Sequence, residues 1–143
     1  MKNSAKTVLI GYGNSLREDD GFGPAVAALL SQHGGIKSLA AHQLVPEMAQ
    51  EIAQGERVIF VDINIENPPG VFAVPLTNAY DPLGHTLTPW QVIELARVLF
   101  DFEGDFLVFS VGGACFGHQE RLSPPVAQAA EVLSRSIKEQ FTL

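Results

Sequence analysis

Three nearly continuous apolar runs constrain the fold of this chain more than any other feature. They cover residues 7–13, 57–64 and 105–111. Such runs are typical of strands that are covered on both faces, as in a parallel sheet. Two further segments, 38–44 and 70–76, complete a set of five predicted strands. Pro75 favours an edge position for the segment 70–76, because proline cannot donate a hydrogen bond to a strand ladder.

Helical patterns lie between and after these strands. The first places its apolar residues on one helix face: Phe22, Val26, Leu29 and Leu30. Two more cover 46–55 and 88–100, and Thr88 with Gln91 forms a capping box at the start of the latter. The last helix follows Ser123 and buries Val126, Ala129, Ala130, Leu133 and Ile137. The order β-α-β-α-β-β-α-β-α predicts an α/β fold, a three-layer αβα sandwich around a mostly parallel five-stranded sheet, in one domain over residues 1–143.

Charge and cysteine content limit the classes of function. The net charge is −7 and the nine basic residues are scattered, which argues against a nucleic-acid or anionic-membrane partner, because phosphate binding needs clustered Lys and Arg. A single cysteine, Cys115, cannot form an internal disulfide and matches no cysteine-protease signature, so we expect a buried structural residue. The apolar run near the N-terminus is too short for a signal peptide or a membrane span, and we expect a cytoplasmic protein.

The stretch GYGNSLREDDGFGP, residues 11–24, follows the first predicted strand and carries adjacent acids. It does not fit a dinucleotide-binding loop, because Leu16 stands where the third glycine of G-x-G-x-x-G belongs and the acids would repel a pyrophosphate. We expect one acid, Asp19 or Asp20, to be the N-cap of the following helix. An acidic, solvated loop is the alternative interpretation of the remaining charge.

The carboxyl ends of parallel strands form the edge at which α/β proteins bind ligands. The residues that the predicted topology brings to this edge are Asn14, Asp20, His42, Gln43, Asp62, Asn64 and His85. Two carboxylates and an imidazole suit a first-row divalent metal, and acids that converge in a cleft otherwise need a shared proton or open water. Because these residues are far apart in sequence, their spacing alone leaves both a metal-linked site and a plain acidic edge open.

Four segments of the chain resemble the hydrogenase maturation proteases, small endopeptidases that trim the C-terminus of [NiFe]-hydrogenase large subunits. They are VLIGYGNSLREDDGFGP (8–24), HQLVPE (42–47), VIFVDI (58–63) and GHTLTPWQVIELA (84–96). The resemblance spans residues 6–139 and implies a twisted five-stranded sheet. It also implies that Asp20, Asp62 and His85 contact nickel. His42 and Glu47 match only a subgroup of the family, and substrate choice is one role they can have.

The resemblance further implies a substrate that carries its own metal, a large-subunit precursor already loaded with nickel. Asp20 and Asp62 are the implied catalytic residues, either of which can act as general base in the hydrolysis that releases a C-terminal peptide. Whether nickel polarises the scissile carbonyl or only positions the substrate stays open. The sequence contains neither the serine elbow G-x-S-x-G nor the helical zinc motif H-E-x-x-H, so the usual protease machinery is missing from it.

Two other classes of function remain as alternatives. One is a non-catalytic maturation chaperone that binds nickel or the large subunit. The other is an unrelated small-molecule hydrolase, which would need a nucleophile or a closed metal site that the sequence does not suggest. In each case we expect a monomer that binds neither nucleic acid nor membrane.

Overall fold

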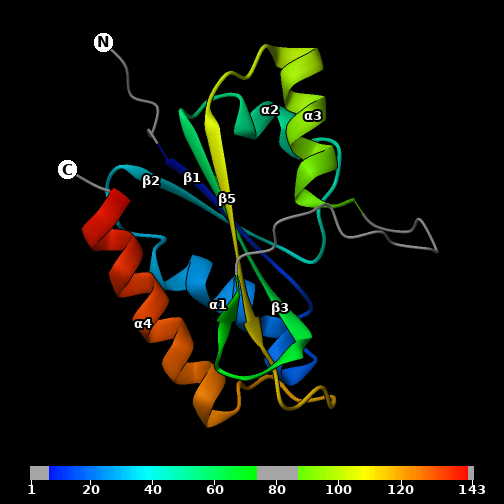
Figure 1. Cartoon of the computed structure of the whole chain (residues 1–143), viewed down its shortest axis with the longest axis vertical. Coiled ribbons are helices and arrows are strands. Elements are labelled where there is room, and N and C mark those ends of the chain that lie inside the picture. Colours follow the sequence, from blue (N-terminus) through cyan, green and yellow to red (C-terminus); the bar gives the residue numbers. More distant parts are fainter. Residues whose placement is uncertain (1–6, 74–86, 142–143) are drawn as a thin grey trace.

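A computed structural model describes residues 7–73 and 87–141 of the chain. Its five strands are β1 Thr7–Tyr12, β2 Ile36–Ala41, β3 Arg57–Pro69, β4 Phe72–Ala73 and β5 Asp105–Gly112. Its helices are α1 Phe22–Leu29, α2 Met48–Ile52, α3 Pro89–Phe100 and α4 Pro124–Phe141, and a 3-10 helix, η1 Glu18–Gly21, precedes α1. The element order is the predicted one, with η1 added (Figure 1).

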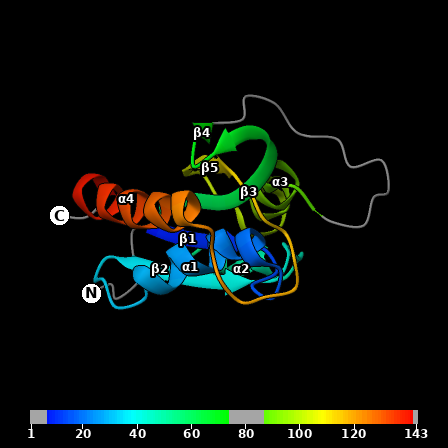
Figure 2. The same cartoon turned by 90° about the horizontal axis from the view of Figure 1, so that it is seen from below.

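The strands form one sheet in the order β2-β1-β3-β5-β4. All neighbouring pairs are parallel except β4 and β5, which are antiparallel. The predicted edge position of the fourth strand is therefore confirmed, although Pro75 lies outside the described residues. β3 continues to Pro69, beyond its predicted end, and its register with β5 shifts between Asn64 and Pro69. Figure 2 shows β3 curving at this end, beside β4.

Helices cover both faces of the sheet and make the predicted three-layer sandwich. On one face α1 and α4 pack over a cluster that contains Leu9, Ile59 and Val61. On the other face the cluster contains Val8 and Phe60 together with residues of α2 and α3. Because side chains alternate along a strand, neighbouring residues of β1 and β3 enter opposite clusters. This double burial explains the continuous apolar runs in the sequence.

The helix predictions hold in most positions. All five apolar residues predicted for the last helix are buried. At the start of α3 the backbone N–H of Gln91 donates to Thr88 Oγ1 at 3.2 Å, and the backbone N–H of Thr88 donates to Gln91 Oε1 at 2.8 Å, so the capping box is confirmed. Leu29 was expected on the apolar face of the first helix, but it is 41% exposed, whereas the next residue, Leu30, is buried.

Within the part of the chain that the structure describes, no helix has the length and apolar character needed to cross a membrane.

Candidate active site

The carboxyl edge of the sheet carries a short row of polar side chains. Gly11 of β1 pairs with Val61 of β3, so the next residue of β1, Tyr12, lies level with Asp62. Asp62 in turn pairs with Ser110 of β5. By the alternation of the strands, all three polar residues lie on the face that α2 and α3 cover. The row begins where the apolar core of that face ends.

One carboxylate oxygen of Asp62 accepts a hydrogen bond from the described part of the chain, and the other does not. Tyr12 Oη donates a hydrogen bond of 2.7 Å to Asp62 Oδ2. Asp62 Oδ1 is buried, and no hydrogen bond reaches it from residues 7–73 or 87–141. The hydroxyl of Ser110 lies beside the carboxylate but outside hydrogen-bond geometry with Oδ1, and it accepts a bond of 2.7 Å from Asn64 Nδ2. A buried acceptor without a partner is costly, so Oδ1 marks a position that a ligand can occupy.

The protonation of this row follows from its burial. Burial raises the pKa of Asp62 above its usual range, and the negative charge of Asp20 adds to this, although the hydroxyls of Tyr12 and Ser110 act in the opposite direction. Burial, and then the charge of Asp62, raises the pKa of Tyr12 far above its ordinary value. Tyr12 therefore keeps its proton and acts as a hydrogen-bond donor.

Asp20 reaches the same edge from the loop that follows β1. The backbone N–H of Asn14 donates to Asp20 Oδ2 at 2.8 Å. Gly13 permits this close approach, since a Cβ there would lie 2.0 Å from the Asp20 carbonyl oxygen, and its φ of +145° favours glycine. Asn14 also fixes the turn, because its Oδ1 accepts from the N–H of Leu16 at 2.9 Å. Because the charge of Asp20 raises the pKa of Asp62, the two predicted carboxylates lie within electrostatic reach of each other.

Asp19 is not a helix cap, and the N-cap prediction is wrong for both acids. The N-cap of α1 is Gly21, which offers no side-chain cap, because η1 intervenes between the acids and the helix. Asp19 is 0% exposed. It accepts bonds from the N–H groups of Ala114 (2.7 Å), Cys115 (2.9 Å) and Ser123 (2.7 Å) and from Ser123 Oγ (2.7 Å). Burial alone would raise the pKa of Asp19, but these four bonds outweigh it and lower the pKa.

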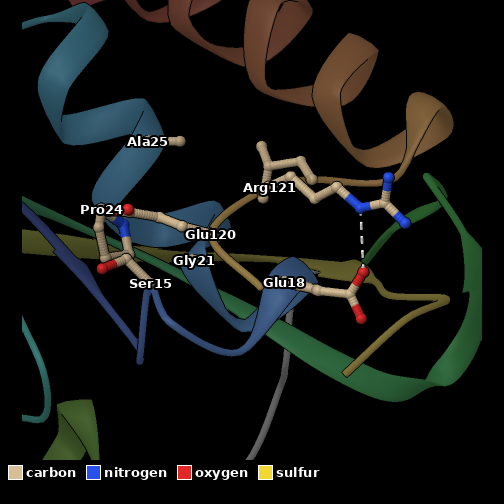
Figure 3. A pocket seen from close by; sticks show the side chains of 8 residues that line it. Ser15, Glu18, Gly21, Pro24, Ala25, Glu120 and Arg121 are labelled. Carbon is tan, nitrogen blue, oxygen red and sulfur yellow. Dashed lines mark hydrogen bonds and ion pairs between the residues drawn. The ribbon is translucent and has the colours of Figure 1, made fainter. Parts of the chain in front are cut away.

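Glu18 binds the same loop between β5 and α4. Its Oε1 accepts from the N–H of Gly117 at 2.7 Å, and its Oε2 accepts from Arg121 Nε at 3.3 Å. Figure 3 shows this ion pair beside a cavity of about 240 Å³ between the loop and the start of α1. The cavity is lined by Ser15, Glu18, Gly21, Pro24, Ala25, Glu120, Arg121 and Leu122. Glu18 and Asp19 thus anchor this loop, and the third adjacent acid, Asp20, lies within electrostatic reach of Asp62.

The remaining predicted residues do not share one position in the structure. His85 lies outside the described residues, so its role as a metal ligand stays a prediction. His42 and Gln43 are exposed at the end of β2, and His42 lines a shallow cavity with Gly13 and Asn14. Asn64 is used within its own turn, because its Oδ1 accepts from the N–H groups of Glu66 (3.1 Å) and Asn67 (2.9 Å).

Cys115 is exposed rather than buried, so that prediction is wrong. In the loop after β5 its side chain does not contribute to the core, whereas its backbone N–H anchors Asp19. Across the described ranges, no three His, Cys, Asp or Glu side chains gather closely enough to hold a metal ion. The edge therefore offers two carboxylates, and a third ligand would have to come from another residue or from a substrate.

Tyr12 is the residue of the site that sequence reasoning missed. Its signal was present, because Tyr12 continues the alternation of Val8 and Ile10 just as Asp62 continues that of Val58 and Phe60. Two polar residues that end neighbouring parallel strands in the same phase must lie side by side on one face.

The fold is that of several solved hydrogenase maturation proteases. The chain is similar to the [NiFe] hydrogenase maturation protease HycI from Thermococcus kodakarensis KOD1, with 24% identity, a TM-score of 0.78, and coverage of 96% of this chain and 93% of that chain. The chain is also similar to the hydrogenase 2 maturation peptidase from Thaumarchaeota archaeon SCGC_AB-539-E09, with 22% identity, a TM-score of 0.69, and coverage of 94% of this chain and 96% of that chain. A third similar structure is the hydrogenase maturating endopeptidase HybD from E. coli, with 19% identity, a TM-score of 0.64, and coverage of 94% of this chain and 93% of that chain. No protein-family model and no curated protein sequence matches the chain.

Proposed function

We propose that this protein is a cytoplasmic hydrogenase maturation protease, an endopeptidase that removes the C-terminal extension of a nickel-loaded [NiFe]-hydrogenase large-subunit precursor. The observation that carries the proposal is the buried Oδ1 of Asp62, which has no hydrogen-bond partner among the described residues and lies within reach of the charge of Asp20. Two converging carboxylates at the carboxyl edge of a parallel sheet are a site for a cation or for a water to be activated.

Two independent observations support the same reading. The sequence segments 8–24, 42–47, 58–63 and 84–96 resemble the maturation proteases. The fold agrees with solved members of that group along almost the whole chain. Fold alone does not determine function, so the proposal depends on Asp20 and Asp62 acting as a pair of carboxylates.

The nickel of the precursor is, in this proposal, part of the substrate. Asp62 Oδ1 and the carboxylate of Asp20 are oxygen donors suited to a divalent first-row metal, and His85 is the proposed third contact. A buried carboxylate oxygen to which residues 7–73 and 87–141 donate no hydrogen bond gains most from such a cation, because the cation offsets the cost of its burial. The enzyme can thereby distinguish a loaded precursor from an empty one.

The same carboxylates are the proposed catalytic groups. Asp62, whose pKa is raised by burial, is a better proton acceptor than an ordinary aspartate and can take a proton from the attacking water. Asp20, in the loop after β1, lies within electrostatic reach of Asp62 and can bind the nickel or orient the water. The hydroxide so formed adds to the scissile carbonyl carbon. The tetrahedral intermediate then collapses, the amide C–N bond breaks, and the leaving nitrogen takes the proton back from Asp62.

Intact-mass spectrometry tests the proposal. A precursor from the same genome, in nickel-loaded and nickel-free forms, is incubated with the wild type, with Asp20→Asn, and with Asp105→Asn as a control. Asp105 is an exposed acid at the opposite end of the sheet. We expect loss of a C-terminal peptide only from the loaded precursor, with the wild type and the control. A stable complex without mass loss would favour a non-catalytic chaperone. The absence of both cleavage and complex formation would contradict the proposal.

A further inference from the structure

We propose that Tyr12 is a positioning residue of this active site, which holds Asp62 by one oxygen so that the other faces the substrate. The inference rests on the proposed function and extends it to a residue outside the carboxylate pair. It starts from the contact between Tyr12 Oη and Asp62 Oδ2, which joins β1 to β3 across 50 residues of chain.

The direction of this hydrogen bond is determined by chemistry. An ionised carboxylate can only accept, so the phenol must be the donor. In the described part of the chain this is the one hydrogen bond that the carboxylate of Asp62 receives, since Oδ1 has no partner and the Ser110 hydroxyl lies outside bonding geometry. The two oxygens of Asp62 therefore have different roles. Oδ2 is bonded to Tyr12, and Oδ1 remains available for nickel or for water.

Without this bond little would hold the carboxylate in its orientation. The terminal torsion of an aspartate is broad and roughly two-fold, so its oxygens exchange easily unless a partner fixes one of them. The charge of Asp20 repels Asp62, and Ser110 offers an alternative donor on the neighbouring strand. A carboxylate that turns toward Ser110 would no longer present Oδ1 in the same direction.

Tyr12→Phe isolates this role. The ring of Tyr12 packs against the cluster under α2 and α3, and phenylalanine keeps the ring while removing only the hydroxyl. The matched control is Ser134→Ala, which removes a buried hydroxyl on α4 that bonds only its own helix, donating to the Glu131 carbonyl at 3.0 Å. Both variants lose one hydroxyl, but only one of them touches Asp62.

The readout is kcat and KM for cleavage of the nickel-loaded precursor, with single-turnover amplitudes giving the fraction of folded, active enzyme. Misplacement of a reacting group by about 1 Å costs up to roughly 100-fold. We expect kcat of Tyr12→Phe to fall by about 10- to 100-fold and KM to rise by a smaller factor, because Asp20 and the proposed contact of His85 still hold the nickel of the precursor. Ser134→Ala should retain the wild-type kcat.

Two results would overturn the inference in distinguishable ways. If the wild type cleaves and Tyr12→Phe shows an unchanged kcat per active molecule, Tyr12 has no positioning role. This holds even if the variant has a lower melting temperature than the wild type. If the wild type cleaves neither the loaded nor the empty precursor, the proposed function fails and the role of Tyr12 fails with it.

Discussion

The contact between α1 and the sheet leads to a prediction at Gly23. A Cβ on this residue would lie 2.5 Å from the backbone N of Tyr12, 2.5 Å from the carbonyl oxygen of Val61 and 2.6 Å from that of Tyr12. These atoms belong to β1 and β3, the two strands at the centre of the site. Backbone atoms of paired strands cannot rotate away as the end of a long side chain can, so Gly23→Ala must push α1 off the sheet.

The size of the effect follows from these distances. Ordinary contact begins near 3.4 Å, so the new methyl group is about 0.9 Å too close to the nearest atoms. Overpacking of this kind costs about 3 kcal/mol, whereas replacing glycine by alanine in a helix gains at most about 1 kcal/mol. We therefore expect Gly23→Ala to lower the free energy of unfolding by about 2 kcal/mol or more. Helix propensity alone predicts the opposite sign.

Urea unfolding followed by circular dichroism measures this difference. Gly34→Ala is the matched control, because a Cβ there would meet nothing within 4 Å. We expect the control to be neutral or to gain about 0.4–1 kcal/mol through the unfolded state. If Gly23→Ala unfolds at the same urea concentration as Gly34→Ala, the close packing of α1 on β1 and β3 is refuted.

Three further predictions concern Asp19, Thr88 and Cys115. Asp19→Ala should lower the free energy of unfolding by about 2–4 kcal/mol at neutral pH, because three N–H groups of the loop after β5 lose their acceptor. The pKa of Asp19 is lowered in the folded state, so its contribution to stability is present above the pKa of an unfolded aspartate and disappears as pH falls through the folded value. If Asp19→Ala lowers the free energy of unfolding by the same amount in acid as at neutral pH, this assignment is contradicted. Thr88→Ala should cost about 1 kcal/mol through loss of the capping box, and a variant with the wild-type midpoint would count against that cap. The exposed thiol of Cys115 should react with a thiol reagent in the native protein, and a thiol that reacts only after denaturation would show that it is buried.

Much of the fold is predictable from the sequence because the layers leave a direct mark on it. Strands buried on both faces need continuous apolar runs, and the runs at 7–13, 57–64 and 105–111 became the three central strands. The extension of β3 to Pro69 left no such mark. Apart from the exposed Ile65, its residues are polar or proline, and it pairs with β5 through an irregular register that only the tertiary structure determines.

The predictions for the loops failed where distant contacts decide the outcome. Asp19 was expected at a helix start, which is a local preference, but it binds a segment as far as 104 residues away. The same loop exposes Cys115, whose type alone predicts burial. Local rules cannot anticipate a carboxylate that serves as the anchor of another loop.

The candidate site was predictable to the extent that topology determines it. Asp20 and Asp62 were expected at one edge because parallel strands bring their carboxyl ends together, and the structure places them within each other's electrostatic reach. The state of the two Asp62 oxygens depends on side-chain geometry, which the sequence does not contain. His85 lies outside the described residues and stays a prediction.

The most direct test of the carboxylate site is cleavage of the nickel-loaded precursor by Asp62→Asn, compared with the wild type at equal folded concentration. Asparagine keeps an oxygen that can accept from Tyr12 but cannot act as a base or carry the charge that a cation needs. We predict that the wild type releases the C-terminal peptide while Asp62→Asn leaves the precursor at its full mass, with both proteins equally folded. Cleavage at the wild-type rate by Asp62→Asn would contradict the assignment of this carboxylate to the chemistry.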